Sequence, residues 1–148
     1  MNVRSFALGL CLLGASSAAV AATPGCVPII EQAWIRAAPP GAMTLAAYAI
    51  VRNPCTRAVA ITEVSSGDFA MAMIHETQVQ DGVSKMRHVD SLPLPAHGEV
   101  RLAPGGTHLM LMSPKRKLKA GDTVQLSLTL ADGRLISGDF PIRSDPPK

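Results

Sequence analysis

Short runs of alternating hydrophobic and polar residues fill most of the 148-residue chain, and residues that favour turns separate the runs. Glycine, proline, aspartate and asparagine recur at intervals of roughly 8–12 residues, the spacing of strands in an all-β sandwich or barrel. No stretch of the later chain keeps a helical period over about three turns. The runs are Thr44–Asn53, Ala58–Ser66, Met71–Gln80, Val83–Asp90, Gly98–Gly106, His108–Ser113, Asp122–Gly133 and Arg134–Arg143.

A further hydrophobic run, Ala33–Met43, is interrupted by Pro39 and Pro40. Proline cannot donate a hydrogen bond to a neighbouring strand, so within sheets it is found mainly on edge strands. We therefore expect this run to form an edge strand that ends at the two prolines.

The start of the chain has the three parts of a cleaved secretory signal. Arg4 supplies the positive charge, residues 6–13 are apolar, and "AVA" at residues 19–21 fits the signal-peptidase rule. The apolar part is shorter than the roughly 20 residues of a spanning helix, and no later segment is long enough to anchor the product in a bilayer. Leu10 is too bulky for a lipoprotein box at Cys11. We predict a signal peptide over residues 1–22 and one domain over residues 23–148, with its core in residues 33–143.

The charge of the chain makes nucleic acid an unexpected partner. Removing the signal removes Arg4 and lowers the formal charge from +3 to +2. The chain has no lysine and arginine stripe with interleaved aromatic residues, which is the usual mark of a nucleic-acid surface. The one basic cluster, Lys115–Lys119, is typical of a solvated loop between strands.

Two cysteines, Cys26 and Cys55, remain after the signal is removed. Their even number in an exported chain predicts a disulfide, and their spacing is not that of a C-x-x-C redox pair. Such a bond would tie the N-terminal segment to an early strand. Closing a loop of about 30 residues would stabilise the fold by roughly 3 kcal/mol.

Asp81 and Gly82 between two strand-like runs are a strong signal for a two-residue hairpin turn. Directly opposed residues of a hairpin share a face. His75, Met86 and His88 should therefore lie on one side of this hairpin. The pairs that follow from the turn are Gln80 with Val83, Thr77 with Met86, and His75 with His88.

His108 and Met110 have the same parity on a separate strand, so their side chains should point the same way. Their Cα atoms should lie roughly 6.5–7 Å apart, a gap that one metal ion can bridge. The Pro-Gly-Gly turn before His108 predicts a position at the rim of the sandwich. Met112 continues the parity, and we expect it to fill the core. The alternative reading is that each of these histidines and methionines is packed or hydrogen-bonded with no metal.

The spacing of these residues matches a known family. Ten residues separate His75 from Met86, and twenty-one separate Met86 from the H-x-M of His108 and Met110. Together with the blocks "AWIRAAPPGAMTLAAYAIVRN", "MIHETQVQDGVSKM" and "LAPGGTHLMLM", this spacing resembles the periplasmic copper chaperone family PCu(A)C. The similarity extends over residues 33–112.

The resemblance implies a cupredoxin-like or immunoglobulin-like Greek-key β-sandwich located in the periplasm. It implies a Cu(I) site made of His75, Met86, His108 and Met110. It also implies delivery of copper to the dinuclear centre of cytochrome c oxidase subunit II, alone or with a Sco-type thiol protein. His88 and Met73 lie outside the family pattern and are candidates for additional ligands.

The ligand chemistry fits a carrier. Thioethers and imidazoles suit soft Cu(I) without a thiolate, which matters in a compartment that oxidises thiols. A blue-copper electron carrier needs a cysteine close to its histidine and methionine ligands, and Cys55 is far from His108. No hydrolase or phosphate-loop motif occurs, so we expect no enzyme activity. Two alternatives remain: copper sequestration for tolerance, and an exported β-sandwich that binds a protein without metal.

Overall fold

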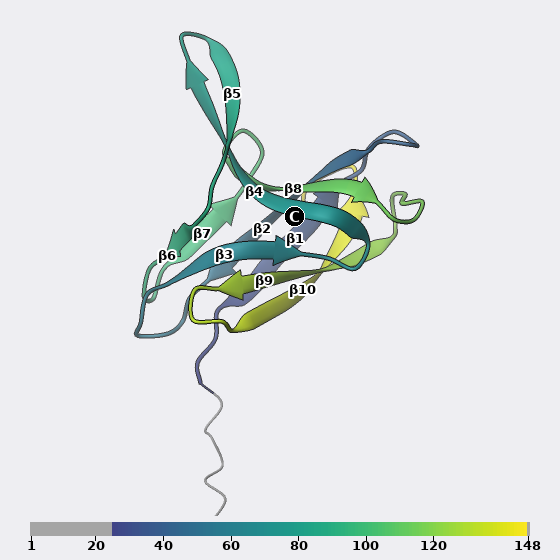
Figure 1. Cartoon of the computed structure of the whole chain (residues 1–148). Helices are drawn as coiled ribbons and strands as arrows, with labels where there is room; N and C mark the ends of the chain where they lie inside the picture. Colours follow the sequence, from purple (N-terminus) through teal and green to yellow (C-terminus); the bar gives the residue numbers. More distant parts are fainter. Residues whose placement is uncertain (1–24, 148) are drawn as a thin grey trace, which may run out of the picture.

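The computed structural model describes residues 25–147, which form ten β-strands and no helix (Figure 1). The predicted signal peptide, residues 1–22, lies outside the described residues. The described part of the chain contains no helix that is long and apolar enough to cross a membrane. The strands are β1 (Ile29–Arg36), β2 (Thr44–Arg52), β3 (Val59–Ser65), β4 (Phe69–Gln80), β5 (Val83–His88), β6 (Leu92–Leu94), β7 (Glu99–Leu102), β8 (Thr107–Pro114), β9 (Thr123–Leu130) and β10 (Leu135–Arg143).

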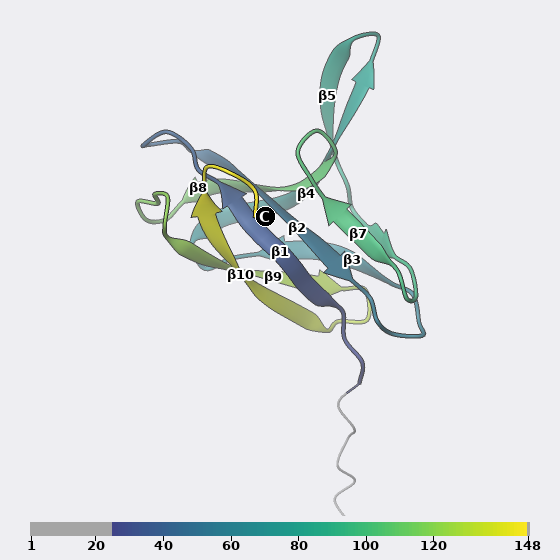
Figure 2. The ribbon, with the colours of Figure 1, turned by 180° about the vertical axis from the view of Figure 1, so that it is seen from behind.

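The strands form two layers that face each other (Figures 1 and 2). The first layer has the order β5-β4-β8-β2-β1, and β7 pairs with the part of β2 that β8 leaves free. The second layer has the order β10-β9-β3-β6. A short parallel pairing of β1 with β10 joins the layers, with Ile35 opposite Ile142. The prediction of an all-β sandwich is confirmed.

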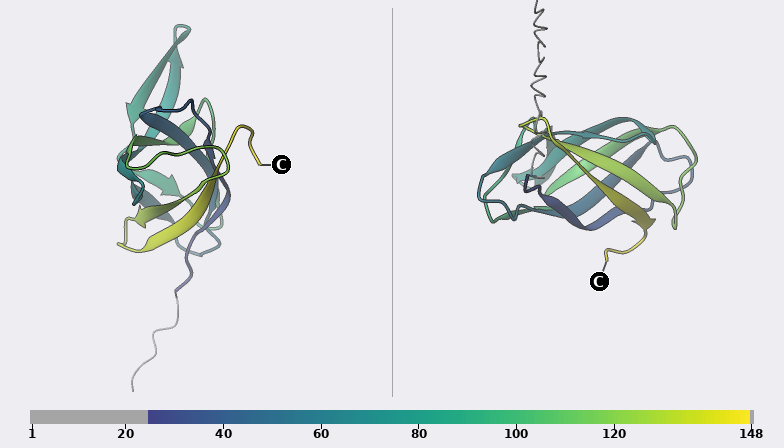
Figure 3. Two further views of the ribbon diagram at one scale, coloured as in Figure 1. Left: turned by 90° about the vertical axis from the view of Figure 1, so that its right-hand side faces the viewer. Right: turned by 90° about the horizontal axis from the view of Figure 1, so that it is seen from below.

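Inward-facing aliphatic side chains from both layers make the core. On β9 the residues alternate strictly, and Leu126 and Leu128 are fully buried. On β8 the inward residues are Leu109 and Leu111, which meet the second layer. Each such side chain contributes roughly 1.5–3 kcal/mol through burial, so the alternation holds the layers together. Figure 3 shows the two layers from the side and from below.

The prediction that Ala33–Met43 forms an edge strand is wrong. The strand is β1, and it lies between β2 and β10 in the middle of the strand order. Pro39 and Pro40 follow its last residue, Arg36, so neither proline removes a hydrogen-bond donor from the sheet. An edge strand with a proline does exist, but it is β6, where Pro93 lies in the middle of three residues.

The β4–β5 hairpin extends from the sandwich as a two-stranded arm (Figures 1 and 3). Asp81 and Gly82 form its turn with φ angles of 53° and 76°. Positive φ at both central residues is the mark of the turn whose twist matches a hairpin. The predicted register is confirmed: His75 pairs with His88, Thr77 with Met86 and Gln80 with Val83.

The predicted disulfide is present between Cys26 and Cys55, whose Cα atoms lie 5.6 Å apart. It ties the segment before β1 to the loop after β2. Asn53 is buried beside it and orders the same loop. The Asn53 side chain donates hydrogen bonds to the carbonyl oxygens of Arg57 and Pro95, at 2.8 and 3.0 Å.

Candidate metal centre

The outer face of the first layer carries histidines and methionines from two neighbouring strands. On β4 and β8 the residues that alternate with them, such as Ile74 and Leu109, are buried in the core. The antiparallel register of β4 with β8 therefore decides which outward residues meet. It places His75 opposite His108, Met73 opposite Met110, and Met71 opposite Met112.

His75 lies in the middle of a row of three imidazoles. Its ring centroid is 6.2 Å from that of His108 on β8 and 5.9 Å from that of His88 on β5. Both neighbouring rings are nearly perpendicular to it, with interplanar angles of 83° and 84°. Two residues distant in sequence, His75 and His108, are thus direct cross-strand neighbours.

The ring of His108 has a defined orientation. The side chain is buried, and its Nδ1 lies 3.0 Å from the carbonyl oxygen of Gly106. Because a carbonyl can only accept, Nδ1 of the neutral ring carries the proton and Nε2 keeps its lone pair. A backbone hydrogen bond of this kind orients histidine ligands in metal sites.

His75 has a buried ring nitrogen, Nδ1, without a hydrogen-bond partner in the described structure. Burial lowers the pKa of His75 below 6.5, and the neighbouring His108 and His88 lower it further. The ring therefore stays neutral at neutral pH. Buried polar atoms are normally satisfied, so this unpartnered nitrogen calls for a partner, and a bound ion is one that would satisfy it.

Met86 and His88 approach His75 from the hairpin side. Met86 lies on β5, opposite Thr77 of β4, and its side chain is 61% exposed. His88 is exposed, and its Nε2 lies 3.2 Å from Oδ1 of Asp90. His88 therefore has a carboxylate partner outside the row, whereas the thioether of Met86 has room to move.

The imidazoles do not make a metal site by themselves. Within residues 25–147, no three or more histidine, cysteine, aspartate or glutamate side chains are arranged to hold a metal ion. Any ion at His75 and His108 must complete its shell with other donors. The donors on this face are thioethers: Met86 from the hairpin, and Met73 and Met110 from the adjacent row.

Met112 does not fill the core as expected. It lies half-buried on the outer face, opposite Met71, because it shares the parity of His108 and Met110. The core positions of β8 are taken by Leu109 and Leu111.

Two aromatic residues that the sequence analysis did not identify extend the row of rings. Tyr48 on β2 lies beside His108, with ring centroids 6.5 Å apart, and Trp34 on β1 packs on Tyr48 at 4.8 Å. Both are buried and cover one side of the site. The outward parity of Tyr48 within its run is the signal that could have located it.

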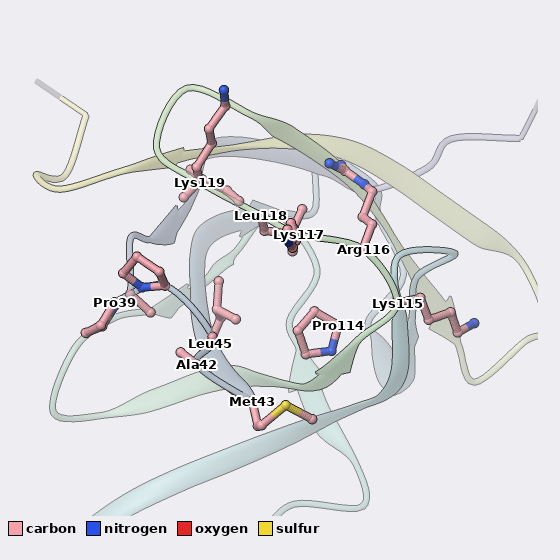
Figure 4. Close-up of a pocket in the computed structure, with 14 residues that line it drawn as sticks. Pro39, Ala42, Met43, Leu45, Pro114, Lys115, Arg116, Lys117, Leu118 and Lys119 are labelled. Carbon is pink, nitrogen blue, oxygen red and sulfur yellow. The ribbon is translucent and has the colours of Figure 1, made fainter.

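A groove of about 760 Å³ lies where β1 and β8 end, separate from the histidine row (Figure 4). Its walls include apolar residues such as Leu45 and Leu118, together with the exposed Met43. The basic cluster Lys115–Lys119 lies in the loop between β8 and β9 with its basic side chains exposed, as predicted, and it also lines this groove.

The fold resembles that of PCuAC-type domains of known structure. The apo PCuAC domain from PmoF1 superposes with a TM-score of 0.66 at 23% identity, over 80% of this chain and 94% of that one. The apo form of DR1885 from Deinococcus radiodurans has 27% identity and a TM-score of 0.63, over 98% and 97% of the two chains. The Cu(I) form of DR1885 has 30% identity and a TM-score of 0.62, over 88% and 86%.

The sequence itself matches the family described as "Putative lipoprotein LpqE-like" over residues 29–142. A curated relative, "Putative lipoprotein Lxx21020" from Leifsonia xyli, is 31% identical over 95% of this chain and 89% of its own length. The chain belongs to the LpqE-like family, and its assignment to the PCu(A)C type is confirmed.

Proposed function

We propose that this protein is a copper carrier of the periplasm. It binds one Cu(I) ion through His75, Met86, His108 and Met110 and delivers it to cytochrome c oxidase. His88 and Met73 stand next to this set as auxiliary donors.

The observation that carries the proposal is the pairing of His75 with His108 on an outer sheet face. The ring nitrogen of His75 lacks a partner, and Nε2 of His108 has its lone pair free. Met110 lies one row away on β8, and Met86 lies on β5 on the other side of His75. This register supports the proposal that two imidazoles and two thioethers share one Cu(I) ion.

The donor set favours Cu(I) over harder ions. Thioether sulfur is a soft ligand that selects Cu(I), whereas Mg²⁺ and Ca²⁺ require oxygen ligands. Solved relatives of the same fold include one named as a copper-bound PCuAC domain and one named as Cu(I)-DR1885, which supports this choice.

Release is as important as binding in a carrier. Four neutral ligands leave the charge of the ion uncompensated, so a site with thiolates should take the ion away. The exposed Met86 gives an acceptor direct access to one ligand. We propose copper transfer to the dinuclear centre of cytochrome c oxidase subunit II or to a Sco-type protein, with no enzyme activity of its own. The family name of a lipoprotein and the Cys26–Cys55 disulfide support an exported location.

The test of binding is a Cu(I) competition titration against a chromophoric chelator. Wild type should bind one tight equivalent, and His108→Ala with Met110→Ala should lose it. Ser127→Ala on the outer face of the second layer is the matched control and should bind like wild type. Unchanged tight binding in the double variant would refute the site.

The test of delivery is genetic. A deletion strain should lose oxidase activity under copper limitation and recover it with the wild-type gene but not with the double variant. Copper sensitivity of the deletion strain with normal oxidase activity would instead indicate sequestration for tolerance.

A further inference from the structure

The methionines of this protein avoid its core. Of seven methionines in the chain, six lie among the described residues, and none of the six is in the buried core. Five of them share the outer face of the first layer with the histidine row. These five are Met71, Met73, Met86, Met110 and Met112.

Three of the five are not needed for the proposed Cu(I) site. Met71 lies directly opposite Met112, and Met73 lies in the adjacent row, opposite Met110. Directly opposed residues of antiparallel strands have Cβ atoms about 4.5–5.5 Å apart, and diagonal neighbours stay within reach of long side chains. The thioethers of Met71, Met73 and Met112 can therefore meet above one point of the sheet.

The surroundings of these three residues leave space above them. On β2, the residue opposite Met112 is Thr44 and the residue opposite Met110 is Ala46, both small and uncharged. On the other side, β5 pairs with β4 only from His75 to Gln80, beyond the three methionines. Met71 is 49% exposed.

Packing alone does not account for this arrangement. The inward positions of the same strands, such as Ile74 and Leu111, already fill the core. Met73 and Met112 are only half-buried and Met71 is exposed, so three adjacent thioethers bring soft donors to a surface position where they have no hydrogen-bonding role. Three thioethers offer Cu(I) a neutral set of the soft ligands that it prefers.

We propose that Met71, Met73 and Met112 form a second, weaker site for Cu(I) beside the histidine site. The inference deepens the proposed function and rests on it, because it gives the carried ion a second position on the same face. Repulsion between two monovalent ions at neighbouring positions should make the second ion bind more weakly than the first.

The two sites are joined by the pair of Met73 and Met110, which face each other. An ion passes between the sites when one thioether replaces another in its shell. Copper stays Cu(I) throughout, so no electron or proton moves. The second site therefore serves as a loading or unloading position next to the tight one.

The experiment uses the mature protein with ¹³C-labelled methionine methyl groups, titrated anaerobically with Cu(I) and separately with Ag(I). Native mass spectrometry should count two ions in wild type. The first equivalent should shift the methyl signals of Met86 and Met110, and the second should shift those of Met71 and Met112. The signal of Met73, which faces Met110, should respond to both ions. The wild-type signals keep the test valid even if a variant folds poorly.

Met71→Leu with Met112→Leu should bind one ion, with the first affinity within about threefold of wild type. Met43→Leu is the matched control, since Met43 is an exposed methionine that lines the groove (Figure 4) and has the opposite parity to Thr44, the β2 partner of Met112. It should bind two ions. Unmoved Met71 and Met112 signals, or a Met43 signal that shifts together with them, would overturn the second site.

A further variant, His75→Ala with His108→Ala, separates this inference from the proposed function. If both proposals hold, it binds one ion and shifts only the signals of the three methionines. If the histidine site is wrong, its stoichiometry equals that of wild type. If only the thioether site is wrong, wild type binds one ion and this variant binds none.

Discussion

The two layers share the same alternation of inward and outward residues, but their outer faces carry different kinds of side chain. On β9 every second residue points outward and is an ordinary surface residue: Thr123, Gln125, Ser127 and Thr129. There Ser127 forms a 2.8 Å hydroxyl–hydroxyl hydrogen bond to Ser137 of β10. On β8 the outward residues are instead one imidazole and two thioethers, from His108, Met110 and Met112.

The inward residues explain why the outward ones can differ so much. Both strands present leucines to the core, such as Leu126 on β9 and Leu111 on β8. Burial of these side chains fixes the sandwich, since it removes apolar surface from water. The outward positions are therefore free to carry any chemistry, and on one layer they carry soft metal donors. Substitutions should separate cleanly into those that affect the fold and those that affect copper.

The largest effect should come from an inward residue. Leu126→Ala removes a fully buried side chain and should lower the free energy of unfolding by about 2–5 kcal/mol. The folded fraction should still bind Cu(I) with wild-type stoichiometry. Chemical denaturation measures the first quantity and a chelator competition the second. Loss of copper binding in the folded variant would break the separation of the two roles.

His75→Ala should weaken copper binding strongly and change stability little. Removing one of two imidazoles should weaken Cu(I) binding by more than about 100-fold, beyond the 10–100-fold that is typical for residues behind the ligands. The half-buried position should cost less than about 2 kcal/mol in stability. Competition titration beside thermal unfolding tests both, with Ser137→Ala as the surface control. An equal loss of affinity in the control would show that the two outer faces do not differ.

Met86→Leu should have a smaller effect on copper. Leucine keeps the size and removes the sulfur of an exposed residue, so stability should stay within about 1.5 kcal/mol of wild type. Cu(I) affinity should fall about tenfold, equivalent to losing about 1.4 kcal/mol of binding. Val79→Leu, an exposed site on the same hairpin, is the control. Unchanged affinity for Met86→Leu would remove the hairpin from the site.

The smallest effect should be the response to pH. Burial and the adjacent His108 and His88 lower the pKa of His75 below 6.5. The unfolded chain therefore takes up this proton first as the pH falls. The stability linked to neutral His75 is present above pH 6.5 and is lost as the pH falls through the lowered pKa. In the apo protein, NMR titration of the His75 ring should give a midpoint below 6.5, and His75→Gln should flatten the decline in stability below that pH. A midpoint above 6.5 would contradict the described burial.

The hairpin could be predicted from sequence because its signal is local. Asp81 and Gly82 fix the turn, and the turn fixes the register that pairs His75 with His88. The disulfide followed from the count of cysteines and the predicted signal peptide. The regular spacing of short strand-like runs and turn residues predicted the sandwich, because it is the spacing of strands in all-β folds.

The central pairing of the site could not be predicted from local signals. His75 and His108 belong to strands that are not consecutive, so no turn sets their register. That register depends on how Ile74 and Leu109 pack in a core made by the whole chain. The edge position expected for β1 was wrong for the same reason. Its pairing with β10 joins the two ends of the domain, and no local turn signals that pairing. The ligand roles of His75, Met86, His108 and Met110 came from the family spacing, and they stay a prediction until copper binding is measured.

The bond between Cys26 and Cys55 also determines how this site has to be handled. Thiolates bind Cu(I) more strongly than thioethers, and opening the bond would place two of them in the same chain. The common reductant dithiothreitol would open the bond, and the two thiolates would then compete with the sheet face for Cu(I). Ascorbate keeps copper monovalent without attacking the bridge, so the choice of reductant decides which end of the molecule an affinity measurement reports.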